Sequence, residues 1–229
     1  SAKYGALVWS GDIVSTFECF RRQVQAGLNM AIAGIPWWTT DIGGFHGART
    51  DDPDFHRLYI RWFEYGCFCP VMRLHGNRNP QEGYGAEQIG SGSDNEIWSF
   101  GDKAYEISKK YIFLRERLRD YIRTQMKKAH EDGTPMMRPV FYDFPTDQES
   151  WNVEDAYLFG PDLYVAPVME DHVTEREVYL PDGTAWFNAW TGEKYEGGQN
   201  VTVAAPLDTI PVFVKEGADA EKLLNIFSE

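Results

Sequence analysis

The first half of the chain alternates short apolar runs with longer amphipathic stretches, and this rhythm limits its fold more than any other feature. Residues 4–9 read Tyr-Gly-Ala-Leu-Val-Trp, and two further apolar runs follow at residues 35–40 and 68–74. Stretches with an apolar face at helical spacing lie between and after these runs. Strands that are buried on both faces and joined by helices are typical of parallel βα units, so the sequence predicts an α/β architecture.

The expected helices have recognisable start signals. Ser15 and Glu18 form a capping box, after which apolar residues recur at helical spacing. Asp52 and Pro53 open a second helix, because an N-cap acid followed by proline at the first helical position is a favoured start. The longest helix is expected over residues 102–130.

The second half has a different pattern. After Gly133, short strand-like runs are interrupted by turn dipeptides at residues 182–183, 191–192 and 197–198. This spacing predicts an antiparallel meander or sandwich. We therefore expect two domains, over residues 1–148 and 149–229.

Composition excludes some classes of partner. Asp and Glu number 35 against 22 Lys and Arg, and the formal net charge is −13, which disfavours nucleic acid. No apolar run approaches the roughly 18 residues that a membrane helix needs. The three cysteines lack the spacing of a zinc site or a disulfide framework, so we expect reduced thiols and a cytoplasmic protein. The oligomeric state is left open, with a homo-oligomer as one option.

A polar residue follows or ends each of the three expected strands. Asp12 comes after the first strand and Asp41 after the second, while Arg73 and His75 end the third. Loops at the carboxyl ends of parallel strands converge on one rim. Two carboxylates, a guanidinium and an imidazole are therefore expected to face a common pocket.

This set of groups suits glycoside cleavage, which needs one carboxylic acid to protonate the departing oxygen and a second carboxylate to attack or to activate water. Asp12 and Asp41 are the candidates. Structural alternatives stay open for each residue: Asp12 as a helix cap, Asp41 as an Asx-turn residue, Arg73 as its ion-pair partner and His75 as a core histidine. A metal site built from Asp12, Asp41 and His75 is a further alternative, but no ligand spacing in the sequence supports it, and no cofactor is expected.

Two other features bear on the pocket. Trp37 and Trp38 alternate faces on the second strand, and we expect Trp38 to be the one that faces the pocket. His46, like the other histidines outside the third strand, is expected to be a surface residue without a partner.

Taken together, five segments resemble glycoside hydrolase family 31, which contains α-glucosidases, α-xylosidases and related transglycosylases. The matching segments are residues 9–12 (Trp-Ser-Gly-Asp), 34–45 (Gly-Ile-Pro-Trp-Trp-Thr-Thr-Asp-Ile-Gly-Gly-Phe), 70–75 (Pro-Val-Met-Arg-Leu-His), 158–162 (Leu-Phe-Gly-Pro-Asp) and 205–213 (Ala-Pro-Leu-Asp-Thr-Ile-Pro-Val-Phe). They occur in the family's order. The resemblance implies strands six to eight of a TIM barrel followed by the proximal β-domain.

The resemblance also implies roles for individual residues. Asp12 corresponds to the general acid and base, while Asp41, Arg73 and His75 correspond to residues that bind the sugar at the cleavage subsite. Trp9 and Phe45 would line the same pocket. The family's nucleophile is an aspartate in a Trp-x-Asp segment on the fourth strand, and no such segment occurs in this sequence.

The leading hypothesis is therefore part of a retaining, exo-acting α-glycosidase that removes terminal α-linked glucose or xylose from oligosaccharides. The chain alone is expected to be inactive, because the nucleophile belongs to the missing N-terminal part of the same catalytic domain. One alternative is a noncatalytic carbohydrate-binding or interaction remnant. Another is pairing with a separately encoded N-terminal half through the strand at residues 4–9.

Overall fold

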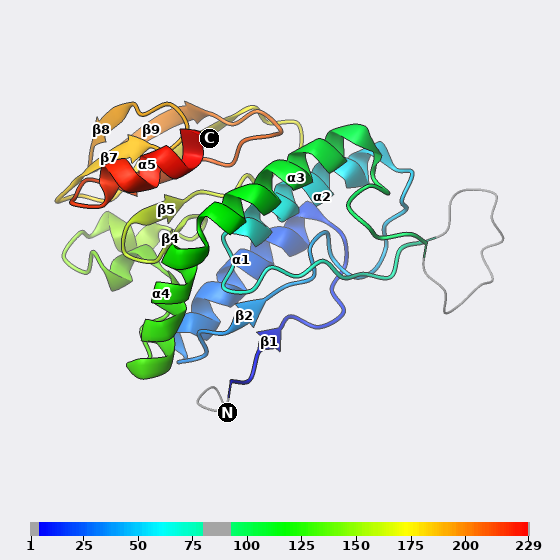
Figure 1. Ribbon diagram of the computed structural model, residues 1–229, viewed down its shortest axis with the longest axis horizontal. Helices are drawn as coiled ribbons and strands as arrows, with labels where there is room; N and C mark the ends of the chain where they lie inside the picture. The colour runs from blue at the N-terminus through cyan, green and yellow to red at the C-terminus, as the bar shows by residue number, and fades with distance from the viewer. Residues whose placement is uncertain (1–4, 80–92, 229) are drawn as a thin grey trace.

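The computed structural model describes residues 5–79 and 93–228. Its first half is built from two short strands and four helices (Figure 1). In chain order these are β1 (Val8–Trp9), α1 (Phe17–Ile32), β2 (Trp38–Thr39), α2 (Pro53–Cys67), α3 (Gly101–Arg117) and α4 (Arg119–Glu131). The predicted alternation of strands and helices is confirmed for the first two strands. Part of the polar stretch between α2 and α3 lies outside the described residues.

Strands β1 and β2 pair in parallel, as expected for a βα unit, with Val8 opposite Trp38. The third apolar run, residues 68–74, was expected to be a strand but is not one. The run lies alongside β2 in parallel orientation and is joined to it by isolated hydrogen bonds. In one of these, the N–H of Val71 donates to the carbonyl of Trp38 at 3.2 Å. Helix α2 extends to Cys67, and Pro70 has no N–H to donate, so little of the run can form a regular ladder.

The helix starts follow local capping chemistry. Thr16 is the N-cap of α1, because its hydroxyl accepts a hydrogen bond from the N–H of Cys19 at 3.1 Å. The predicted cap, Ser15, is one residue early: its N–H donates instead to the carbonyl of His46 at 2.8 Å. Asp52 caps α2 as predicted, with proline at the first helical position.

The single helix expected over residues 102–130 is in fact two. Helices α3 and α4 are separated by Leu118, which is fully buried. The bend directs α4 toward the C-terminal strands, where the hydroxyl of Tyr121 donates to the carbonyl of Phe159 at 2.9 Å. The same hydroxyl accepts from the N–H of Asp162 at 3.2 Å. The apolar stripe continues through Leu118, so periodicity alone could not reveal the break.

Gly160 allows this contact between α4 and the sheet. Its φ is +68°, and a Cβ at this position would lie 2.2 Å from the Tyr121 hydroxyl. Gly160→Ala is expected to lower the free energy of unfolding by about 2–3 kcal/mol, through backbone strain and the displaced tyrosine. Urea unfolding of the chain measures this. Gly183→Ala is the matched control: its φ is +88°, but no atom outside the adjoining residues lies within 4 Å of the added Cβ, so only the strain of about 1 kcal/mol is expected.

The second half is mostly antiparallel sheet, as predicted. Its elements are β3 (Met137–Arg138), η2 (Val140–Tyr142), η3 (Glu149–Asn152), β4 (Tyr157–Phe159), β5 (Leu163–Val165), β6 (Glu175–Leu180), β7 (Ala185–Asn188), β8 (Lys194–Glu196), β9 (Gln199–Ala204), β10 (Val212–Lys215) and α5 (Ala220–Ser228). A six-stranded sheet has the order β3-β4-β5-β10-β7-β8, and β6 pairs with β9. Val178 and Val203 from the pair pack with Trp186 and Phe213 from the larger sheet in one apolar cluster.

The two halves share contacts rather than sitting apart. The largest apolar cluster joins Trp62 of α2 with Leu163 and Val214 of the six-stranded sheet. Helix α1 contacts both β2 and β3, and Figure 1 shows α2 and α3 side by side to the right of the C-terminal strands. The Tyr111 hydroxyl of α3 accepts from the N–H of Ile210 at 3.0 Å. The segment at residues 205–213, singled out in the sequence, thus includes a loop that rests on the helices.

Two further observations concern the cysteines and the length of the helices. Cys67 and Cys69 are buried, Cys19 is partly exposed, and all three are free thiols. Among residues 5–79 and 93–228, no helix is both long and apolar enough to cross a membrane. The cytoplasmic location and the domain boundary at residue 148 stay predictions.

Candidate functional site

The site is centred on an ion pair between Asp41 and Arg73. Asp41 follows β2 and is fully buried, and its Oδ1 accepts a hydrogen bond from Nη1 of Arg73. The guanidinium of Arg73 also lies over the ring of Trp9, 5.7 Å from its centroid. The predicted residues at the ends of the first two strands and of the third apolar run therefore come together.

The Asp41 carboxyl is in an unusual electrostatic setting. Burial raises its pKa above the ordinary value, while the charges of Arg73 and His75 lower it and the neighbouring carboxylate of Asp12 raises it. Asp12 and His75 thus lie close enough to act on Asp41, as the sequence predicted. The second oxygen of Asp41, Oδ2, is buried without a hydrogen-bond partner among the described residues. An unsatisfied buried acceptor is costly, and a hydroxyl donor would satisfy it.

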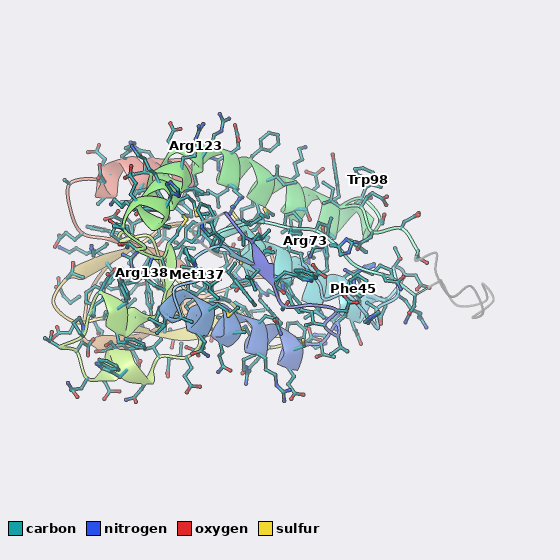
Figure 2. The ribbon with its side chains drawn as sticks, turned by 90° about the horizontal axis from the view of Figure 1, so that it is seen from below. Phe45, Arg73, Trp98, Arg123, Met137 and Arg138 are labelled. Carbon is teal, nitrogen blue, oxygen red and sulfur yellow. The ribbon has the colours of Figure 1, made fainter. Side chains whose placement is uncertain are left out.

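Aromatic and imidazole rings surround the carboxylates. Phe45 lies 5.3 Å from the ring of His75 and 4.4 Å from that of His46, measured between centroids. His46 Nε2 is 4.0 Å from Oδ2 of Asp12. The side chain of His46 is 48% exposed and that of Asp12 is 61% exposed. Figure 2 shows Phe45 and Arg73 in the same part of the molecule, away from Met137 and Arg138.

His46 is a residue that the sequence reasoning missed, since it was expected to be an isolated surface histidine. Its backbone explains its place: the N–H of His46 donates to the carbonyl of Ile13 at 2.9 Å. The adjacent Phe45 N–H donates to the same carbonyl at 2.7 Å. The loop after β2 is thereby held against the segment that carries Asp12. The sequence signal that could have identified His46 is its position directly after Phe45, which was expected to line the pocket.

The other histidines expected to be isolated differ. His56 Nε2 lies 2.6 Å from the carbonyl of Thr50. His172 Nε2 lies 2.9 Å from Nη2 of Arg57. His130 is exposed at the end of α4. Within residues 5–79 and 93–228, none of the three hydrogen-bonds to Asp12, Asp41, Arg73 or His75. The partners of His56 and His172 lie on a loop and on α2.

Trp38 does not join the site. Its register partner is Val8, whereas Trp9 is paired with Thr39, so Trp38 projects from the face opposite to Trp9. Its indole is buried beneath α1, where a Cβ on Gly27 would lie 2.6 Å from its Nε1. The expectation that one tryptophan of the pair packs under the helices is confirmed, but it is Trp38 and not Trp37 that does so. By the alternation of side chains along the strand, Trp37 lies on the same face as Trp9.

Arg78 is a second residue that the sequence did not reveal. It is buried, and its guanidinium donates to the carbonyls of Ile42 at 3.2 Å and Gly44 at 2.8 Å. It also lies 4.6 Å from the ring centroid of Phe55, and burial lowers its pKa to about 10. Arg78 therefore fixes the loop that follows Asp41, a positioning role with no sequence signature of its own.

The arrangement suits a neutral polyhydroxylated ligand. It offers an exposed carboxylate at Asp12, a buried carboxylate and guanidinium pair at Asp41 and Arg73, and aromatic rings at Trp9 and Phe45. Charged acceptors and donors orient hydroxyl groups, and aromatic faces cover apolar C–H surfaces. No group of three or more His, Cys, Asp and Glu side chains in the described parts of the chain could hold a metal ion.

Comparison with known proteins agrees with this geometry. Residues 1–125 match the family model of the glycosyl hydrolases family 31 TIM-barrel domain, and residues 133–218 match that of the glycosyl hydrolase family 31 C-terminal domain. An α-xylosidase of Saccharolobus solfataricus is 38% identical over 216 residues, covering 94% of this chain and 28% of that protein. Alpha-glucosidase 2 of Bacillus thermoamyloliquefaciens is 35% identical over 217 residues, covering 93% of this chain and 25% of that protein.

Solved structures lead to the same family. The crystal structure of a GH31 α-xylosidase from a soil metagenome, complexed with xylose, superposes with a TM-score of 0.89 at 53% identity. The match covers 96% of this chain and 34% of that one. The chain thus spans about a third or less of the length of these relatives. The family models match part of a TIM-barrel domain followed by a C-terminal domain, which in this structure is built of antiparallel sheets. The chain belongs to glycoside hydrolase family 31.

Proposed function

We propose that this chain is part of a retaining, exo-acting α-glycosidase that releases terminal α-linked xylose or glucose from oligosaccharides. The observation that carries the proposal is that Asp12, Asp41 and His75 lie close together beside Arg73, whose guanidinium lies over the ring of Trp9. The α-xylosidase among the solved relatives, at 53% identity, favours xylose as the first substrate to test. We further propose that the barrel portion supplies strands six to eight, with the domain boundary at residue 148.

In this proposal Asp12 is the general acid and base. Its side chain is 61% exposed and therefore accessible to a substrate. It would donate a proton to the departing glycosidic oxygen, while an aspartate on the family's fourth strand attacks the anomeric carbon. Asp12 would then take a proton from the water that releases the sugar.

The remaining residues hold the sugar that is cleaved. The free oxygen of Asp41 would accept a hydrogen bond from a sugar hydroxyl, and Arg73 and His75 would donate to others. Trp9 and Phe45 would cover the apolar surface of the ring. Arg73 has both a fixed partner and an aromatic neighbour, so its guanidinium is oriented before substrate arrives.

The test is hydrolysis by the complete enzyme of p-nitrophenyl α-xyloside and α-glucoside, with the β-anomers as matched controls. We expect release from at least one α-substrate and none from the β-anomers. Proton NMR of the first turnovers should show the α-anomer of the free sugar, because two displacements retain configuration. Initial appearance of the β-anomer, or hydrolysis of neither α-glycoside, would refute the proposed reaction.

A further inference from the structure

A cavity of about 360 Å³ lies between α1 and the segment that carries η2 and η3. It contains none of the residues of the Asp41 site. Its α1 wall includes Gln25 and Asn29, and its other wall includes Phe141 and Trp151. Its volume is in the range of sites that hold small organic ligands.

The aromatic wall is rigidly built although much of it faces solvent. Phe141 and Trp151 stack with their centroids 4.4 Å apart and their planes 4° from parallel. The indole N–H of Trp151 donates to the carbonyl of Pro145 at 3.1 Å, and the residue is still 55% exposed. A hydrogen-bonded, stacked indole has lost its rotational freedom before any ligand arrives, which lowers the entropic cost of binding.

The α1 wall carries the polar residues Gln25 and Asn29 beside the apolar Leu28 and Ile32, and Glu154 lies next to its polar part. The amide of Gln25 donates to a carboxylate oxygen of Glu154 at 3.2 Å, which orients both groups. The exposed amide of Asn29 lies one helical turn further along α1. Amides both donate and accept, and a carboxylate accepts, so this wall matches vicinal hydroxyl groups. Glu154 and the net charge of −13 disfavour an anionic ligand.

We propose that this cavity is a second saccharide-binding site, which holds a pyranose unit of a neutral α-linked oligosaccharide at a distance from the reacting carboxylates. A pyranose has one surface of C–H groups and a rim of hydroxyls. The cavity offers aromatic rings on one side and, on the other, amide groups and a carboxylate beside apolar side chains of α1. The choice of α-linked sugar rests on the proposed function. The site would bind the oligosaccharide that the barrel processes and so raise its local concentration.

The experiment is a titration of the chain with isomaltotriose and with α-xylosyl-(1→6)-glucose, followed in ¹⁵N NMR spectra. The backbone N–H signal of Asn29, which lines the cavity and is present in every variant, gives the affinity, and the indole N–H signal of Trp151 reports the place of binding. The signal is assigned by its loss in Trp151→Phe. We expect a saturable shift with a dissociation constant on the order of 1 mM. Trp151→Ala should weaken binding about five- to tenfold, and Gln25→Ala should weaken it without removing an aromatic ring. Phe113→Ala, which removes an exposed ring on α3, is the matched control and should bind like the parent chain.

Repeating the titration with Asp41→Asn separates the two proposals. Binding at Trp151 should persist in that variant, and it should persist even if the complete enzyme hydrolyses no α-glycoside. Unchanged affinity in both Trp151→Ala and Gln25→Ala would overturn the second site. So would a Trp151 signal that shifts with neither sugar.

Discussion

Replacing Asp12 by Asn in the complete enzyme is expected to lower kcat/KM on natural α-glycosides by about 10²–10⁴-fold. Asparagine has a similar size and keeps hydrogen bonding, but it can neither donate the proton that the departing oxygen needs nor accept one from water. The loss should be smaller in the first step for a glycosyl fluoride, because fluoride leaves without protonation. This difference between leaving groups identifies an acid, whereas a folding defect would lower activity on both substrates equally.

Asp120→Asn is a suitable control, because Asp120 is an exposed aspartate in the first turn of α4 and lies outside the site. It should retain the parent activity. If Asp12→Asn stays within about tenfold of the parent on a natural glycoside, the general acid is another residue. In that case the neighbouring His46 becomes the next group to substitute, since it is the imidazole nearest to Asp12 in the described site.

Features governed by neighbours in sequence were predictable. Asp52 caps α2 because its side chain and the following proline act within one turn. Asp12, Asp41 and His75 were found because strand ends in parallel βα units converge. The choice of Trp38 failed because the face of a strand residue depends on register, and that register is set by pairing with Val8 on a separate strand.

The features that were not predicted depend on contacts between residues that are far apart in the sequence. His46 reaches Asp12 because its loop is bonded to the carbonyl of Ile13, more than thirty positions earlier. Arg78 holds residues 42–44 from the segment after the third apolar run. The break at Leu118 precedes the turn of α4 whose Tyr121 contacts the sheet at Phe159. Each required the tertiary arrangement, which composition and periodicity do not contain.

The second large effect is expected at Arg61, which joins the two halves of the molecule from the buried face of α2. Its guanidinium donates to four backbone carbonyls of the C-terminal half, namely Val173 at 3.2 Å, Ala205 at 2.7 Å, Pro206 at 2.9 Å and Thr209 at 3.3 Å. It also donates to Oε2 of Glu64 at 3.2 Å, and both side chains are buried. Burial raises the pKa of Glu64 to about 8, and the charge of Arg61 opposes that rise.

Arg61→Ala should lower the free energy of unfolding by about 3–5 kcal/mol, because it leaves Glu64 and the carbonyls buried without their cation. Arg57→Ala is the matched control one turn away. Arg57 pairs with Asp171 at 2.7 Å in a partly exposed position, and about 1 kcal/mol is expected there. Denaturant unfolding of the chain measures both. Equal losses would show that the buried contacts of Arg61 contribute nothing beyond a surface pair.

The pH dependence gives an independent check. Glu64 has a folded pKa above its ordinary value, so its protonation stabilises the folded state fully below about pH 4.5, and this contribution is lost as pH rises toward 8. Glu64→Gln should remove that decline. Without Arg61 the pKa of Glu64 rises further, so the decline continues past pH 8 and the deficit of Arg61→Ala is larger at pH 9 than at pH 6. Combining Arg61→Ala with Glu64→Gln should then cost less than the sum of the single changes, because no buried carboxylate remains to be ionised.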